Sequence, residues 1–172
     1  MYSKKYVKYS YINFTFDTKI YICLFIYKWI NFILGMLMFL SVLNSTEKEE
    51  FLNLVINVAN VDGEFSDIEK AQVNAYALEM GLILKDNDNY TKSTDSLITS
   101  LSKSENTTKK AIFMEIVALM LVDGMNDKEK SLLDSIQKAF EFDDKFRNDT
   151  IEWYSEILPL YKKGFELAGI GA

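Results

Sequence analysis

Apolar side chains recur every three or four residues from residue 46 onward, and this period predicts helices. We expect the first helix to begin at Thr46, because Thr46 and Glu49 have the spacing of a capping box. Gly63 should end this helix, since glycine enters the left-handed conformation most easily. Its apolar face consists of Phe51, Leu52, Leu54, Val55, Val58 and Ala59.

The same period predicts five further helices, and the first and fourth of these begin at the capping pairs Ser66/Glu69 and Asn126/Glu129. Pro159 is expected to kink or divide the last helix, because a proline inside a helix removes a hydrogen bond. No strand pattern competes with these helices, so the chain predicts an all-α fold, a compact bundle of about six to seven helices. The expected ranges are 66–81, 94–102, 108–122, 126–140 and 144–165, with 108–122 apolar enough to be the central helix.

The tripeptide Val-Asp-Gly occurs twice, at residues 61–63 and 122–124, and each copy follows an apolar run. Aligning the two copies pairs residues 49–63 with residues 110–124, and the apolar positions largely coincide. Such self-similarity indicates a duplicated structural unit. We therefore expect the bundle to contain two pseudo-symmetric helical hairpins.

Residues 1–35 differ from the rest of the chain in composition. They contain no alanine and no glutamate, and nearly two thirds of them are Tyr, Ile, Lys, Phe or Asn. Three interpretations stay open: translation upstream of a true start at Met36 or Met38, a membrane anchor or contact through residues 20–43, and a helix packed on the domain. Residues 20–43 are long and apolar enough to cross a bilayer, with Lys28 as their one charge. We divide the chain into this segment, residues 1–37, and a helical domain, residues 38–172.

Composition excludes several kinds of chemistry. The chain has no histidine, and its one cysteine, Cys23, lies in the N-terminal segment. Ser-His and Cys-His catalysis, Cys/His zinc sites and disulfides are therefore excluded. A bound metal would need oxygen ligands, which favours a hard divalent cation such as calcium, magnesium or manganese.

The net charge of −6 is unevenly distributed along the chain. Residues 1–35 carry five lysines against Asp17 alone, which leaves −10 for residues 36–172. The domain has scattered lysines but no basic stripe that could neutralise phosphates, so we expect no nucleic-acid binding. An acidic surface of this kind favours cationic partners or ions.

The two acidic turns resemble a known family. The segment from Val61 to Lys70 looks like the acidic signature of the tellurite-resistance TerB-like domain family, which includes the N-terminal domain of the DjlA co-chaperone. The segment from Val122 to Lys130 is similar to the second motif of that family, and the resemblance covers about residues 38–142. It implies a compact all-helical domain linked to bacterial stress responses, with a metal-related role in some members and no enzymatic activity.

Four carboxylates are the candidate site residues: Asp62, Glu69, Asp123 and Glu129. Each Asp ends one helix and each Glu lies in the first turn of the next, so a pair could share a hard cation. A second interpretation gives Glu69 and Glu129 a capping role only. The second turn is one residue shorter than the first, which weakens the case for a symmetric pair of sites.

Two functions follow from these features. The first is a non-enzymatic stress-response module that binds a protein partner through an acidic helical surface. The alternative is a domain that binds or senses a hard metal ion through the repeated turns. We expect no catalytic residues and no cofactor, and a cytoplasmic location unless the N-terminal segment anchors the protein in a membrane.

Overall fold

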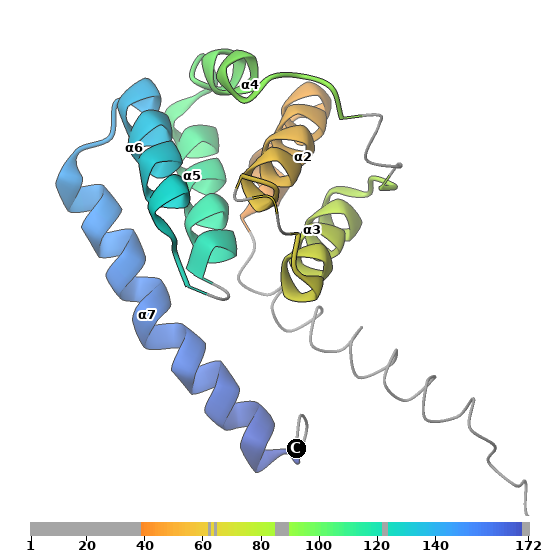
Figure 1. Ribbon diagram of the computed structural model, residues 1–172, viewed down its shortest axis with the longest axis vertical. Helices are drawn as coiled ribbons and strands as arrows, with labels where there is room; N and C mark the ends of the chain where they lie inside the picture. Colours follow the sequence, from red (N-terminus) through yellow and green to blue (C-terminus); the bar gives the residue numbers. More distant parts are fainter. Residues whose placement is uncertain (1–38, 62, 64, 85–89, 122–123, 170–172) are drawn as a thin grey trace, which may run out of the picture.

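The computed structural model describes residues 39–61, 63, 65–84, 90–121 and 124–169, and these residues form only helices, turns and loops. The all-α prediction is therefore confirmed for this part of the chain. A short 3-10 helix, η2, opens it, and six α-helices follow (Figure 1). The elements are η2 (Leu40–Val42), α2 (Ser45–Ala59), α3 (Asp67–Met80), α4 (Thr94–Leu101), α5 (Asn106–Leu121), α6 (Asp127–Phe140) and α7 (Asp144–Leu167).

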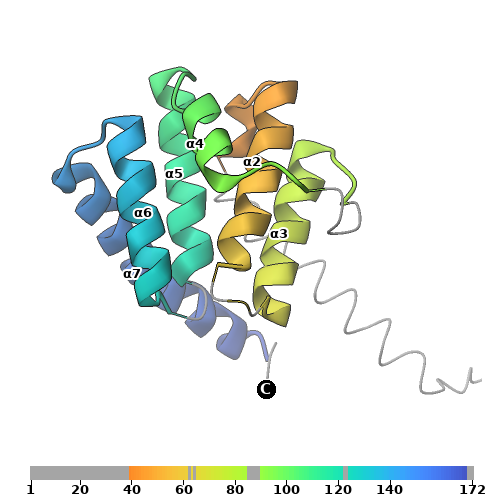
Figure 2. The ribbon, with the colours of Figure 1, turned by 45° about the horizontal axis from the view of Figure 1, so that its top comes forward.

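Four helices lie side by side in the order α6, α5, α2 and α3, as Figures 1 and 2 both show. Within this row α2 contacts α3 and α5, and α5 contacts α6. The short helix α4 packs on α2 and lies above the row in Figure 1, whereas α7 packs on α5 and its C-terminal half extends beyond the bundle. The two inner helices, α2 and α5, supply much of the core, so the expected central position of α5 is shared with α2.

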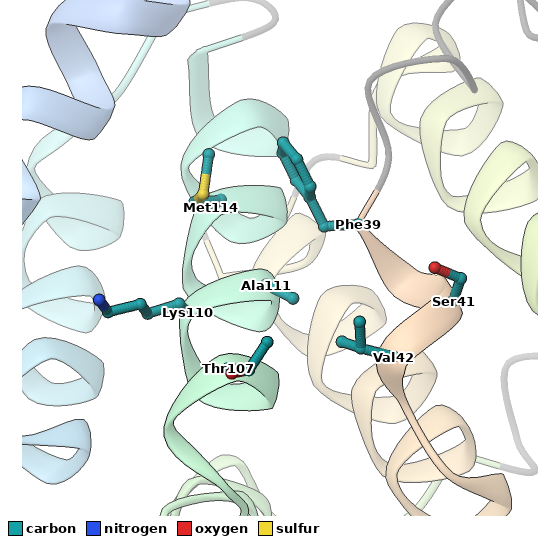
Figure 3. A pocket seen from close by; sticks show the side chains of 7 residues that line it. All are labelled: Phe39, Ser41, Val42, Thr107, Lys110, Ala111 and Met114. Carbon is teal, nitrogen blue, oxygen red and sulfur yellow. The ribbon is translucent and has the colours of Figure 1, made fainter.

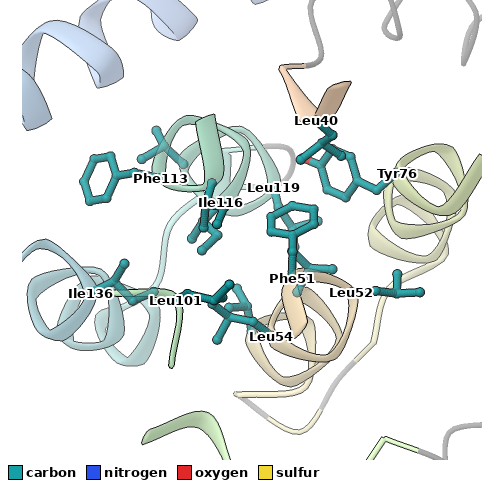
Figure 4. Packing of buried hydrophobic residues seen from close by; sticks show 14 of the residues in the cluster. Leu40, Phe51, Leu52, Leu54, Tyr76, Leu101, Phe113, Ile116, Leu119 and Ile136 are labelled. Atoms are coloured by element: carbon teal, nitrogen blue, oxygen red, sulfur yellow. The ribbon is translucent and has the colours of Figure 1, made fainter. Parts of the chain in front are cut away.

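The core consists of aliphatic and aromatic side chains from all of these helices (Figure 4). Phe51 of α2 meets Tyr76 of α3 edge to face, with ring centroids 5.5 Å apart. Beside α6, Phe113 of α5 packs against Phe142 and Phe146, which ties α7 to the bundle. Interlocking rings of this kind favour one arrangement of the helices over others.

Three details differ from the sequence-based expectations. The first helix begins at Ser45, one residue before Thr46, because Asn44 forms the capping box with Glu47. It also ends at Ala59, four residues before Gly63, although Gly63 does adopt a positive φ of 95°. Of the kink or division expected at Pro159, the division is wrong, because α7 continues through this residue as one helix.

Part of the apolar stretch at residues 20–43 belongs to the domain. Leu40 and Leu43 are 0% and 4% exposed and lie in the core, so the end of this stretch is buried by protein. Residues 20–38 and the proposed boundary at residue 37 lie outside the described residues. In the described part, no helix combines the length and apolar character needed to cross a bilayer.

The two helical hairpins, α2–α3 and α5–α6, share several local contacts. Lys48 Nζ of α2 donates to the carbonyl oxygen of Met80 at the end of α3 (3.4 Å), and Lys109 Nζ of α5 donates to that of Phe140 at the end of α6 (3.2 Å). Lys48 and Lys109 are equivalent positions in the sequence repeat. These contacts agree with a duplication, while a symmetric arrangement of the two hairpins stays a prediction.

Candidate functional site

The predicted site residues Glu69 and Glu129 occupy equivalent capping boxes. The amide of Ser66 donates to Glu69 Oε2 (2.8 Å), and the Glu69 amide donates back to Ser66 Oγ (3.2 Å). In the second hairpin the amide of Asn126 donates to Glu129 Oε2 (2.8 Å), and the Glu129 amide donates to Asn126 Oδ1 (3.0 Å). Glu69 and Glu129 are only 5% and 4% exposed. Both glutamates therefore stabilise helix N-termini, as the capping interpretation expects.

The other two predicted ligands, Asp62 and Asp123, lie outside the described residues. The glycines that follow them, Gly63 and Gly124, have φ angles of 95° and 104°, a conformation that favours glycine. Across the described ranges no group of three or more Asp, Glu, His or Cys side chains gathers to hold a metal ion. The structure therefore explains two of the four carboxylates by capping, and the metal site stays a prediction.

A second pair of glutamates, absent from the predicted site, holds the segment that precedes α2. We call this segment, Phe39–Leu43, the strap; it contacts both α3 and α5. The amide of Phe39 donates to Glu115 Oε1 of α5 (2.8 Å), and the next amide, that of Leu40, donates to Glu79 Oε1 of α3 (3.1 Å). Two successive amides of the strap are thus bound by carboxyl groups from two different helices.

Burial changes the protonation of both carboxyl groups. Glu115 is 1% exposed, and this burial raises its pKa to about 8. The amide of Phe39 acts in the opposite direction, and the charge of Glu79 raises the pKa further. The pKa of Glu79 is also raised by burial, against the lowering effects of the Leu40 amide and of Lys48. At neutral pH the Glu115 carboxyl is therefore mostly protonated.

Two tyrosines complete this buried polar cluster, which consists of Tyr76, Glu79, Glu115 and Tyr154. Tyr76 donates its hydroxyl to the backbone carbonyl of Glu115 (2.8 Å). Tyr154 of α7 is 3% exposed, and burial and the charge of Glu115 both raise its pKa. Among the described residues, the buried hydroxyl of Tyr154 and the buried Oε2 of Glu79 have no hydrogen-bond partner. Such unpaired buried oxygens are uncommon in folded proteins and call for an explanation.

A shallow groove of about 260 Å³ runs along the other side of the strap (Figure 3). Phe39, Ser41 and Val42 form one wall, and α5 forms the opposite wall. Figure 3 shows Ala111 and Thr107 directed toward the strap, whereas Lys110 extends away from it; Lys110 Nζ instead lies 5.2 Å from the ring centroid of Phe146. The groove therefore presents an apolar surface with no charged group directed into it.

The sequence contains one signal for the buried cluster. In the alignment of residues 49–63 with residues 110–124, Glu115 is paired with Leu54. Leu54 is fully buried, and a glutamate at a core position of the most apolar helix is unusual, since charged residues are seldom buried without a partner. The partners themselves, two backbone amides of the strap, could not be identified from the sequence.

No family model, no curated protein and no solved structure matches this chain, so its resemblance to the TerB-like family rests on the two Val-Asp-Gly turns alone.

Proposed function

We propose that this protein is a non-enzymatic interaction module that binds a basic, amphipathic helix of a partner protein along α7. The observation that carries the proposal is the C-terminal half of α7, which extends beyond the bundle (Figure 1) and exposes apolar side chains. Leu160 and Leu167 are 67% and 81% exposed and lie seven residues apart, so they share one face of the helix.

The charge of α7 before Leu160 supports a cationic partner. Asp149, Glu152 and Glu156 are exposed and follow one another at spacings of three and four residues, which places them in one stripe. Glu152 and Glu156 form no ion pair within the described part of the chain. An exposed apolar face beside an acidic stripe suits a helix with leucine-like anchors and flanking lysines or arginines.

A role in a bacterial stress response belongs to the same proposal, and its support is the resemblance of the repeated turns to the TerB-like family. The binding surface on α7 lies outside the two turns, so the two parts of the proposal can fail separately. If no partner binds α7, the interaction role is wrong. If the partner has no part in a stress response, only the stress-response link is wrong.

The test places a photo-crosslinking amino acid at position 160 or 167 of the full chain in its native host. Leu78 of α3 is 68% exposed and serves as a matched control on a different helix. We expect a discrete product from positions 160 and 167 only, containing a basic helical segment, and its loss when Glu152 and Glu156 are both replaced by lysine. Equal labelling from position 78, a product of two copies of this chain, or no effect of the charge reversal would contradict the proposal.

A further inference from the structure

The strap is held by an arrangement that differs from ordinary helix packing. Its side chains Leu40 and Leu43 enter the core, and its amides at Phe39 and Leu40 are bound by the carboxyl groups of Glu115 and Glu79. Phe39 also packs on Trp153 of α7, with ring centroids 6.1 Å apart. The strap therefore closes the space between α3, α5 and α7 above the buried polar cluster (Figure 4 shows Leu40 beside Tyr76).

The closed cluster is incompletely satisfied. One oxygen of Glu79 and the hydroxyl of Tyr154 have no hydrogen-bond partner in the part of the chain that the structure describes, and the two carboxyl groups repel each other when both are ionised. Lifting the strap would admit water to all of these atoms. The free energy of docking the strap thus has a favourable contribution from apolar burial and an unfavourable one from burying polar groups. Only the second contribution depends on protonation.

We propose that the strap is a proton-controlled latch, which stays docked on α3 and α5 while the Glu79–Glu115 pair holds a proton and lifts when both carboxylates are ionised. This device is independent of the interaction surface on α7. The groove beside the strap (Figure 3) has the strap as one wall, so lifting it would merge this groove with the space above the cluster and expose a longer apolar surface.

The direction of the effect follows from the charges around Glu115. Its pKa is about 8 with the strap docked, against an ordinary value near 4.5, so the docked state holds the extra proton between those two values. The docking constant therefore falls as pH rises, by up to about tenfold per pH unit for one proton.

The other groups around the pair do not reverse this direction. Burial raises the pKa of Tyr76 and of Tyr154, so both phenols stay neutral over this range. On α2, Lys48 lowers the pKa of Glu79 without overcoming the effect of burial. Glu79 and Glu115 are then the two groups of the cluster whose charge changes.

Hydrogen exchange on the full chain between pH 5.5 and 7.5 tests the latch, with rates corrected for the intrinsic effect of pH. We expect the protection of residues 39–43 to fall by about 100-fold over this range in the wild type, because one proton is released on lifting. The Glu115→Gln variant should show no such fall. The control is Glu50→Gln, since Glu50 of α2 is a buried glutamate that pairs with Lys92 instead (3.0 Å).

Two outcomes would overturn the latch. One is the same pH profile in the wild type and in Glu115→Gln. The other is simultaneous loss of protection in residues 39–43 and in α2, which would indicate global unfolding. If Glu115→Gln does not fold, Glu79→Gln is measured instead, and it should weaken the fall without abolishing it, because burial is the main cause of the raised pKa of Glu115. Trp153 fluorescence gives a second measurement when both proteins also carry Trp29→Phe. We expect the emission to shift to the red with rising pH when Glu115 is present, and not in Glu115→Gln.

Discussion

The two hairpins have the same stabilising contacts at the ends of their second helices, but different buried residues in the middle of their helices. In both, a glutamate caps the second helix, a lysine of the first helix binds the last carbonyl of the second, and a residue with positive φ follows. In the middle of the first helix the repeat places Leu54 in one hairpin and Glu115 in the other, and both are buried. Helix ends are thus stabilised in the same way twice, whereas the core positions have diverged.

The divergence extends to the second helix of each hairpin. Tyr76 and Glu79 of α3 correspond to Ile136 and Ala139 of α6, which lie at the same distance from their capping glutamates. The polar cluster therefore combines one diverged helix from each hairpin, α3 from the first and α5 from the second. The polar cluster lies where the two hairpins meet the strap.

The largest effect should come from moving the glutamate to the other hairpin. Leu54→Glu puts a carboxyl group at a position that is fully buried, beside none of the strap amides that bind Glu79 and Glu115. A carboxyl group that must take up a proton on burial costs roughly 3–4 kcal/mol at pH 7. The lost burial of the leucine side chain costs roughly 1.5–3 kcal/mol more, so we expect a total loss of roughly 4–7 kcal/mol. Urea unfolding followed by circular dichroism measures it. A loss below about 2 kcal/mol would mean that the two core positions are interchangeable.

The next effect tests the glutamate in its own hairpin. Since the pKa of Glu115 is about 8 in the folded state and near 4.5 when unfolded, its contribution to stability is most favourable below pH 4.5 and declines until about pH 8. Glu115→Gln removes this decline and should stabilise the protein at pH 8 by roughly 3–5 kcal/mol, with little change at pH 4. Unfolding free energies at a series of pH values provide the comparison, and parallel curves for the two proteins would contradict the prediction.

The helical architecture could be predicted from the sequence because its signals are local. Capping pairs such as Ser66/Glu69 and the three-to-four-residue period act within one or two turns, and they located most helices to within a few residues. The errors were also local. Asn44 caps the first helix in place of Thr46. Pro159 lies inside α7, where the second half of the helix is exposed, so water can bind the carbonyl oxygen that lacks a helical hydrogen bond.

The buried cluster could not be predicted in the same way, because its contacts join residues far apart in the chain. The hydrogen bond from Phe39 to Glu115 spans 76 residues, and that from Leu40 to Glu79 spans 39. The alignment did contain one clue, the glutamate opposite Leu54. A site at the two turns could be predicted because their residues are close together in the sequence. In the structure, however, Glu69 and Glu129 of that predicted site cap helices.

Smaller, equal effects are expected where the hairpins agree. Ser66→Ala and Asn126→Ala each remove the side chain that accepts from the amide of the capping glutamate, and each should cost about 1 kcal/mol. Thermal unfolding of both variants tests this equality.

Titration calorimetry with calcium, magnesium and manganese on the wild type separates capping from metal binding, because heats that vanish in Asp62→Ala/Asp123→Ala would support the ion site.

The smallest effect concerns the residues that end the second helices. Gly81 and Glu141 occupy the same position and have φ angles of 70° and 60°, and in each hairpin the following amide closes the helix, at 2.8 Å from Ala77 O and 3.1 Å from Gln137 O. Glutamate is strained in this left-handed conformation, whereas glycine is not. Glu141→Gly should therefore stabilise the protein by about 0.5–1 kcal/mol, and Gly81→Glu should destabilise it by a similar amount. If both substitutions destabilise, the Glu141 side chain has a role of its own at this helix end, and the agreement between the two hairpins is limited to backbone geometry.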